Sequence, residues 1–370
     1  MLKIDIVKTK KDWQDFIGLP WTIYKDNQYW IPPLKSEVKE ILNTEKNPFW
    51  EHARREMFLV RDDKKTVGRI VAIIDDNHNQ FHEDNIGFFG FYESINDFEV
   101  AKLLYDSAKK WLQDNKKDAM RGPLNPSQND EIGFLLEGFD KPPVVMMTYT
   151  PPYYLDLSER YGFKKAKDLY ALLKNAREPV PERIERMVEI IRKKSRVKVR
   201  TVDMKHFNRD LRHLKDIYNA AWEKNWGFVP MTDKEIDLTA KKIKQFIDPG
   251  LVVFAEVDDK PVGVVVTIPD INQVLKRLNG KLGLIEMVKF LYYRRKIDGT
   301  RALIGGIKKE FRQSGIISLL FYESIKHAQK HGYKWCEFGW NLEDNDLINQ
   351  FDMAIGGKIY KKYRIYEMKI

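Results

Sequence analysis

Residues 304–317 carry the pattern best suited to holding a phosphorylated ligand. An apolar strand ends at Gly305-Gly306, a short basic loop follows, and a helix begins at Ser314-Gly315. Backbone N–H groups at a helix start point the same way, and together with the helix dipole and Arg312 they would form a cradle for a pyrophosphate. The Walker pattern and the dinucleotide pattern GxGxxG are both missing. The loop alone is equally compatible with an ordinary basic strand-to-helix turn.

Histidine and cysteine offer less chemistry. His327 and His331 are four apart on a predicted helix, a spacing that can bind a metal ion. No Glu lies between them as in HExxH, so we interpret them as part of a solvated helix face and predict no metal site. Cys336 is the single cysteine, which excludes a disulfide framework and multi-cysteine metal sites. It lies in an apolar strand and is expected to be a buried thiol.

The elements that must position the loop occur twice. Residues 58–75 and 254–270 both predict a strand, a charged turn and a second strand. Two further matches keep the same order: 24–32 with 218–230 upstream, and 103–130 with 319–346 downstream. Three ordered matches indicate a duplicated domain.

Each copy is predicted to contain helices, a hairpin, a strand, a helix, a strand and a closing strand pair. The expected helices are 11–17, 34–43, 98–115, 206–225, 233–247 and 314–331, and the expected single strands are 86–93, 119–123, 301–308 and 333–340. Strands with crossover helices predict an α/β (α+β) fold with helices on both faces of a sheet. We predict domains at 1–176 and 197–370, joined by a helical connector at 177–196.

The composition agrees with two folded domains. A length of 370 residues corresponds to about two domains. A hydrophobic fraction of 43% and a mean hydropathy of −0.51 exclude a disordered, collagen-like or helical membrane protein. The chain start shows no secretory signal, so we expect a cytoplasmic protein. Residues 1–176 hold 26 Lys and Arg against 28 Asp and Glu, whereas residues 177–370 hold 38 against 26. The excess positive charge therefore lies in the half of the chain that contains the loop.

The loop, written Ile307-x-Lys309-x-x-Arg312-x-x-Gly315-x-Ile317, resembles the coenzyme A loop of the GNAT acyltransferase superfamily, whose usual core is Gln/Arg-x-x-Gly-x-Gly/Ala. Arg312 and Gly315 match this core, and Ile317 departs from it. Segments such as Asn47-Pro-Phe49 and Arg121-Gly-Pro-Leu-Asn125 are similar to a poorly characterised bacterial group of tandem GNAT proteins. The resemblance implies two tandem acyl-CoA N-acyltransferase (GNAT-like) domains, each with a mixed, mostly antiparallel sheet.

The resemblance also implies a cofactor site. It assigns acetyl-CoA or a longer acyl-CoA, as co-substrate, to Ile307, Lys308, Lys309, Arg312, Gln313, Ser314, Gly315 and Ile316. The first copy has Phe91 to Asp97 at this place, where two acids would repel a pyrophosphate. We therefore expect only the second domain to hold the coenzyme, and the first to be structural or substrate-binding.

Acyl transfer to an amine by direct attack needs an oxyanion donor and a route for protons. We expect a backbone N–H near Gly306-Ile307 to be the oxyanion donor. The position of the tyrosine usual in this superfamily falls near Phe351-Asp352, and this sequence has no tyrosine there. Polar residues at the end of the next strand are the expected catalytic group, with Glu337 or Glu343 as base and Asn341 and Asn345 orienting substrate. The alternative for Glu343 and Asp344 is capping of the following helix.

Substrate contacts are expected from a polar segment of the first copy and from one aromatic residue of the second: Asn125, Ser127, Asn129 and Trp226. A capped helix start is an equal alternative for the polar segment. The stretch 275–297 is basic and apolar. It predicts a helix that lies in a membrane interface, lines a tunnel for an acyl chain, or packs on its own domain.

These features favour an acyl-CoA-dependent N-acyltransferase acting on a small-molecule or lipid amine. The protein is expected in the cytoplasm, with peripheral membrane contact through 275–297. An aminoacyl-tRNA-dependent transferase is a second interpretation, but such proteins usually lack the coenzyme loop, so nucleic acid is not the favoured partner. A non-catalytic ligand-binding protein on a degenerate GNAT fold is the third interpretation, kept open by Ile317 and the missing tyrosine.

Overall fold

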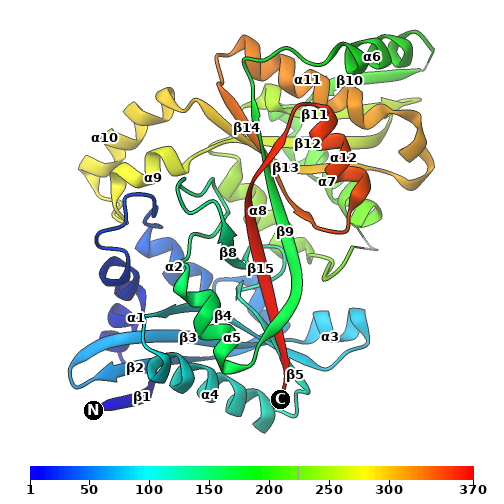
Figure 1. Ribbon diagram of the computed structural model, residues 1–370. Coiled ribbons are helices and arrows are strands. Elements are labelled where there is room, and N and C mark those ends of the chain that lie inside the picture. Colours follow the sequence, from blue (N-terminus) through cyan, green and yellow to red (C-terminus); the bar gives the residue numbers. More distant parts are fainter. Residues whose placement is uncertain (195, 223–224) are drawn as a thin grey trace. The chain divides into compact units, whose positions relative to one another are not determined.

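A computed structural model describes residues 1–194, 196–222 and 225–370, and it contains the predicted repeat of elements (Figure 1). The first copy comprises β1 (Leu2–Ile6), α1 (Lys10–Ile23), α2 (Lys35–Ile41), the 3-10 helix η1 (Pro48–Glu51), β2 (Ala53–Asp62), β3 (Lys65–Asp75), α3 (Asp76–His82), β4 (Ile86–Ser94), α4 (Phe98–Asp114), β5 (Ala119–Gly122), β6 (Leu124–Asn125), β7 (Glu131–Ile132), β8 (Phe134–Glu137), α5 (Tyr153–Tyr161) and β9 (Lys164–Asn175).

The second copy begins with α6 and then repeats the main elements in the same order, with an insert between its third and fourth strands; it passes from β14 directly to α12, where the first copy has β6, β7 and β8 before α5. Its elements are α6 (Glu182–Lys194), β10 (Val197–Thr201), η2 (Met204–His206), α7 (Phe207–Trp222), α8 (Asp233–Ile243), η3 (Pro249–Leu251), β11 (Val252–Val257), β12 (Lys260–Pro269), α9 (Asn272–Leu278), α10 (Leu284–Tyr293), η4 (Arg294–Lys296), β13 (Gly299–Ile307), η5 (Lys309–Ser314), α11 (Ile316–Lys330), β14 (Trp335–Leu342), α12 (Asp346–Ala354) and β15 (Lys358–Lys369). The α/β fold with a repeated element order is thus confirmed.

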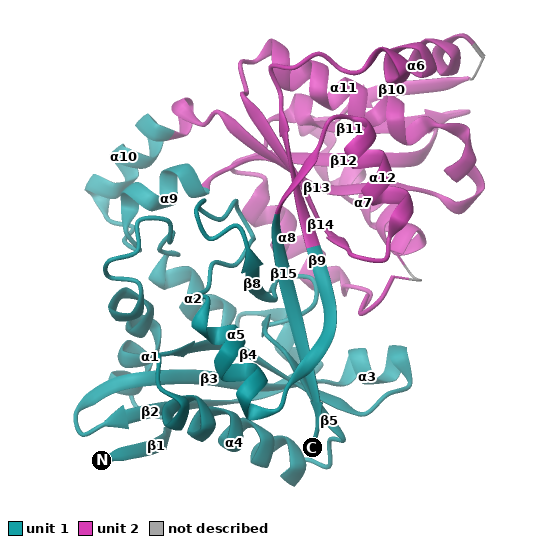
Figure 2. Ribbon diagram, viewed as in Figure 1, with its two compact units in different colours: residues 1–169, 272–293, 361–370 teal, residues 170–271, 294–360 magenta. Residues whose placement is uncertain are grey.

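The chain forms two compact units that are not contiguous in sequence (Figure 2). Unit 1 contains residues 1–169, 272–293 and 361–370, and unit 2 contains residues 170–271 and 294–360. They differ from the contiguous domains expected from the repeat in two respects. The insert of the second copy belongs to unit 1, and the closing strands β9 and β15 are each divided between the units. A strand end pairs with any sheet edge that offers free N–H and C=O groups, so the two ends of one strand can belong to different units whatever their distance along the sequence.

The sheet of unit 1 has the order β1-β2-β3-β4-β5-β15. Its pairs are antiparallel apart from the parallel pair β4/β5. Ile70 and Ile74 of β3 pack with Leu104 of α4 in the core on one face. On the other face, buried Arg69 donates a hydrogen bond to the Phe16 carbonyl of α1 at 2.7 Å. The alternation of side chains along β3 therefore places helices on both faces, as predicted.

The sheet of unit 2 has the order β9-β14-β13-β12-β11-β10. The pairs β10/β11, β11/β12 and β12/β13 are antiparallel, and the pair β13/β14 is parallel. Val188 and Ile191 of α6 join the core formed by Ile316 and Leu320 of α11 with the sheet. The helix predicted as a connector is therefore packed into unit 2. Its amphipathic pattern, with apolar residues spaced by three and four, gives it the buried face.

Candidate active site

The parallel strands β13 and β14 form a fork. Their ladder runs from Gly299 opposite Trp335 to Ala302 opposite Phe338. Beyond Ala302, β13 continues to Ile307 along β12. Across the described residues, no ladder joins these later parts of β13 and β14. The N–H and C=O groups on this side of β13 therefore have no ladder partner in the described part of β14. A backbone N–H that no ladder uses is the kind of donor that an oxyanion site needs.

A buried ion pair supports the fork at its base. Arg301 and Glu337 face each other in the ladder and are 2% and 0% exposed, with Arg301 Nε 3.5 Å from Glu337 Oε1. The Arg301 guanidinium also donates to the Gly339 carbonyl at 2.9 and 3.1 Å, and the Tyr360 hydroxyl donates to Glu337 Oε2. A carboxylate enclosed in this way braces the strands. The prediction of Glu337 as a base stays a prediction, and its burial favours the supporting role.

The predicted coenzyme loop folds as a six-residue 3-10 helix, η5, followed by Gly315 and α11. Gly315 has φ +76°, a conformation that glycine adopts without strain. As the N-cap of α11 it offers no side chain, while Ser314 Oγ accepts the Ile316 N–H at 3.3 Å. The buried side chains of Ile307 and Ile316 fasten the two ends of the loop. The polar residues between them are exposed or half-buried: Lys308, Lys309, Arg312, Gln313 and Ser314.

Arg312 is oriented by the end of α7. Its Nη2 donates to the carbonyls of Ala221 at 3.0 Å and Ala220 at 3.5 Å, in the last turn of that helix. Helix C-terminal carbonyls attract cations, so the guanidinium already has hydrogen-bond acceptors in this position. Gly306 lets α7 lie close to β13, because a Cβ there would be 2.5 Å from the Trp222 ring. The loop, the open strand end and α7 thus meet at one place.

A buried carboxyl group lies at the far end of β14. Asn341 Nδ2 donates to Asp352 Oδ2 at 2.7 Å, and Asp352, in α12, is 2% exposed. Burial raises the pKa of Asp352 from 3.8 to about 7, although the hydrogen bond from Asn341 opposes this. Such a group can give or accept a proton near neutral pH. It was not among the predicted catalytic residues. The signal for it was its position, where the superfamily usually has a tyrosine.

The other predicted catalytic residues lie in the turn between β14 and α12. Asn345 is the N-cap of α12 but makes no side-chain capping hydrogen bond. The turn is held instead by Asn349, whose Nδ2 donates to the Leu342 carbonyl at 2.9 Å. Glu343 is half-buried in the same turn. The structure therefore brings Asn341 next to Asp352 and keeps Glu343 and Asn345 on the adjoining segment.

The corresponding fork of the first copy is filled by its own chain. The β4/β5 ladder ends at Phe88 opposite Arg121. Asn125 Oδ1 then accepts the Phe91 N–H at 2.6 Å, and a Cβ on Gly90 would be 1.6 Å from the Leu124 carbonyl oxygen. The Phe91 N–H at this place is thus satisfied within unit 1. That only the second copy holds the coenzyme stays a prediction.

The residues predicted to contact substrate lie in both units. Asn125 bonds β4 as just described. Ser127 closes a turn, since its Oγ donates to Asp130 Oδ2 at 2.6 Å and accepts the Asn129 N–H at 3.1 Å. Trp226 is half-buried in unit 2. The polar segment of the first copy therefore forms a self-bonded turn rather than a helix start, and its contact with substrate stays a prediction.

The chain is similar to two curated proteins over nearly its whole length. No protein-family model matches it. It is 36% identical to the bacterial ceramide synthase of Caulobacter vibrioides (strain NA1000 / CB15N), covering 99% of this chain and 97% of that protein. It is 32% identical to the protein YghO of Escherichia coli (strain K12), covering 98% and 94%.

Solved structures show the same fold. A tandem GNAT protein from the clavulanic acid biosynthesis pathway matches with a TM-score of 0.57 and 10% identity, covering 100% of this chain and 98% of that one. A GCN5-related N-acetyltransferase from Sphaerobacter thermophilus matches with a TM-score of 0.55 and 12% identity, covering 100% and 95%. These matches confirm the predicted tandem GNAT-like fold.

Proposed function

The chain belongs to the tandem-domain GNAT acyltransferase family that includes the bacterial ceramide synthase, and we propose that it transfers a long acyl chain from acyl-CoA to the amino group of an amphiphilic amine. The full-length similarity to a protein of that name carries the proposal. A ceramide is the amide of a long-chain amino alcohol and a fatty acid. The first candidate for the acceptor is therefore a long-chain amino alcohol, and the first candidate for the donor is a fatty acyl-CoA.

The fork of unit 2 supports direct transfer. The amine nitrogen attacks the thioester carbonyl carbon, the C–S bond breaks, and the electron pair leaves on sulfur. A backbone N–H at the open end of β13, near Gly306-Ile307, polarises the carbonyl oxygen. The loop from Lys309 to Ile316 binds the pyrophosphate with its helix start and Arg312.

Protons move through the β14–α12 end of the site. Asp352 accepts the proton that the attacking amine loses, or returns one to the thiolate, because its pKa of about 7 allows both states at neutral pH. Asn341 holds the carboxyl group in place through its 2.7 Å hydrogen bond. Glu343 is the second candidate for the base, and Asn345 orients the acceptor from the same turn.

The insert supports a lipid substrate. It is anchored within unit 1, where Trp21 Nε1 donates to Asn279 Oδ1 at 2.9 Å, Lys276 Nζ donates to the Gln28 carbonyl at 2.7 Å, and Asn272 Nδ2 donates to the Pro143 carbonyl at 3.0 Å. These contacts fix α9 and leave α10 with exposed apolar side chains. They are Leu284 (91% exposed), Ile285 (69%), Met287, Val288 (68%), Leu291 and Tyr292.

We assign α10 to contact with the surface of an anionic membrane. Six exposed apolar residues on a ten-residue helix are costly in water, and the insert also carries exposed cations at Lys276, Arg277, Lys281 and Lys289. Apolar residues with surrounding cations suit the interface of an anionic bilayer. A helix of ten residues is about 15 Å long, half the hydrocarbon thickness. None of the helices in the described parts of the chain has the length and apolar character needed to cross a bilayer.

The donor is tested by native mass spectrometry with acetyl-, hexanoyl- and palmitoyl-CoA, and the acceptor by product analysis with a long-chain amino alcohol and with ethanolamine. We expect palmitoyl-CoA to bind and the long-chain amide to form. Arg312→Glu should abolish coenzyme binding, whereas Arg186→Glu, the same charge reversal on exposed α6, should not. Failure to bind any acyl-CoA contradicts the donor assignment, and turnover confined to acetyl-CoA and ethanolamine contradicts the lipid substrates.

The membrane surface is tested by co-sedimentation with vesicles of phosphatidylglycerol and phosphatidylethanolamine. Binding should be released by high salt, and Val288→Glu should weaken it at least tenfold. The matched control is Ile190→Glu, which introduces the same charge at a side chain of α6 that is 53% exposed. Equal binding by both variants contradicts the assignment of α10.

A further inference from the structure

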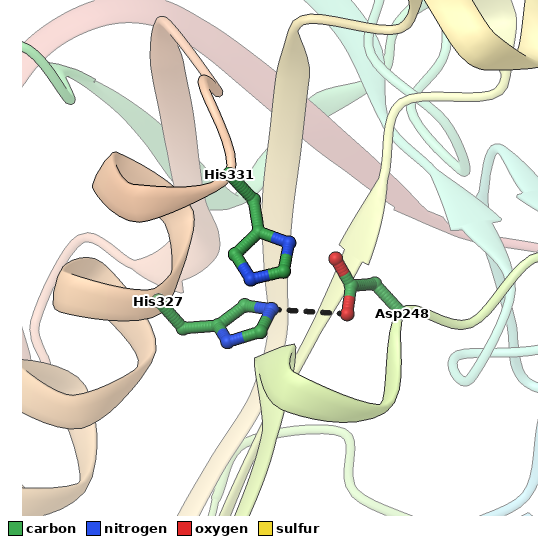
Figure 3. A group of neighbouring side chains, drawn as sticks. All are labelled: Asp248, His327 and His331. Carbon is green, nitrogen blue, oxygen red and sulfur yellow. Dashed lines mark hydrogen bonds and ion pairs between the residues drawn. The ribbon is translucent and has the colours of Figure 1, made fainter.

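A cluster of three metal-ligating residues lies at the end of α11, within unit 2. His327 lies in the last turn of this helix, His331 is its C-cap residue, and Asp248 is the N-cap of η3. One nitrogen of each imidazole and one carboxylate oxygen lie within 4.8 Å of one another. Figure 3 shows both imidazoles on the side of the helix that faces Asp248. His327 Nε2 is 3.1 Å from Asp248 Oδ1.

The carboxylate of Asp248 is fixed by further contacts. The Gly250 N–H donates to Oδ1 at 3.1 Å, and the Tyr333 hydroxyl donates to Oδ2 at 3.2 Å. Gly250 is also required by the adjacent ring, because a Cβ there would be 1.8 Å from Cε1 of His327. Asp248 and His327 are 20% and 23% exposed at their side chains, so the pair is partly shielded from water. The positions of these side chains are therefore set by tertiary contacts as well as by the spacing of the two histidines along α11.

We propose that Asp248, His327 and His331 bind a divalent transition-metal ion such as Zn²⁺. Two imidazoles and one carboxylate are ligands that zinc accepts, with water in the fourth position, whereas Mg²⁺ and Ca²⁺ prefer oxygen ligands alone. Tetrahedral zinc with bonds of about 2.0 Å places its ligand atoms about 3.3 Å apart. His327 and Asp248 already meet this separation. His331 is exposed and its ring stacks on that of His327 with centroids 3.9 Å apart, so metal binding requires its ring to turn towards the ion.

The surroundings of the cluster favour a cation. The last carbonyls of α11 carry the negative end of the helix dipole. Tyr333 orients the carboxylate as the hydrogen-bonded partners of metal ligands commonly do. The sequence spacing alone was interpreted as a solvated helix face. The third ligand comes from a segment 79 residues away in the chain, and only the fold places it there.

The ion has a structural role. α11 has 15 residues and is about 22 Å long, and its first turn adjoins the coenzyme loop. An ion at its last turn joins the segment before β11 to this helix and stays remote from the loop. The site is thus independent of the proposed acyl transfer.

A second histidine pair serves as an internal control. His78 and His82 of α3 have the same spacing and ring centroids 4.5 Å apart, with Asp84 Oδ2 3.4 Å from His78 Nε2. His78 is 2% exposed. Among the described residues, only the cluster at Asp248 brings three ligand atoms close enough to be grouped as a metal site.

The test uses the full chain, stripped with EDTA and titrated with ZnCl₂ by calorimetry, with thermal unfolding as a second readout. We expect one Zn²⁺ per chain and an unfolding temperature raised by Zn²⁺ but not by Mg²⁺. His331→Ala should lower the affinity at least tenfold and remove this rise, while its unfolding temperature in EDTA stays that of the parent, because His331 is exposed. His82→Ala should bind Zn²⁺ as the parent does. Lack of binding, unchanged affinity in His331→Ala, or its loss in His82→Ala would overturn the proposal.

Discussion

Replacing Asp352 by Asn should stabilise the protein at alkaline pH and slow its reaction. Burial raises the pKa of Asp352 to about 7 in the folded protein, against an ordinary value of 3.8. The folded state therefore binds the proton more tightly than the unfolded chain does. Stability is highest while both states are protonated, falls as the pH rises from about 4 to about 7, and is then constant.

The size of the effect follows from this interval. At about 1.4 kcal/mol per pH unit, the ionised carboxylate costs the folded protein about 4 kcal/mol above pH 7. Asn is neutral at every pH, has nearly the same shape, and its amide oxygen can still accept the hydrogen bond from Asn341. The free energy of unfolding of Asp352→Asn minus that of the parent should grow by about 3 kcal/mol between pH 5 and pH 8.

The assay is urea unfolding of the parent and the variant in matched buffers at both pH values. Asp346→Asn, which removes an exposed carboxylate from the first turn of the same helix, is the control and should differ from the parent by a constant amount. A difference for Asp352→Asn that is constant or shrinks as the pH rises would refute the reasoning that burial keeps this carboxyl group protonated.

The same variant separates a supporting role from a catalytic one. If Asp352 transfers a proton, kcat should fall by about 10²- to 10⁴-fold, while the affinity for acyl-CoA stays unchanged. A variant with the expected stability profile and the parental kcat would show a buried acid that takes no part in the reaction.

Three further predictions concern the fork. Arg301→Leu should lower the free energy of unfolding in urea by about 3–5 kcal/mol, because Glu337 is left buried without its cation. The double variant Arg301→Leu/Glu337→Leu should regain part of this free energy. A double variant that regains none of it would contradict the pairing. Gly306→Ala should weaken acyl-CoA binding and cost about 1–3 kcal/mol, since its Cβ would press on Trp222. Gly18→Ala, within α1 and with open space around its Cβ, should instead stabilise the protein by about 0.5–1 kcal/mol, because alanine loses less conformational entropy than glycine in a helix. Calorimetry should give one acyl-CoA per chain, and two would contradict the closed fork of the first copy.

Local patterns in the sequence specify the elements and their repetition. The β-branched runs on either side of charged turns predicted β2, β3, β11 and β12, and the apolar spacing of residues 314–331 predicted α11 within two residues at its start. The loop was recognisable because its residues are consecutive. The helix α3 and the first strands β1 and β10 were not predicted, since each is short and its stability comes from neighbours in the fold.

The sequence by itself determined that this protein contains two copies of one fold and that only the second carries the basic loop. Tertiary structure decided what each copy can do. It filled the first fork with Asn125, opened the second beside β13, placed Asn341 against Asp352, anchored the insert 272–293 within unit 1, and joined Asp248 to two histidines. Each of these contacts links residues that are distant along the chain or in different elements. Helical and strand periodicity fix the faces of single elements, whereas contacts between elements depend on how the strands pair and how the helices pack on them.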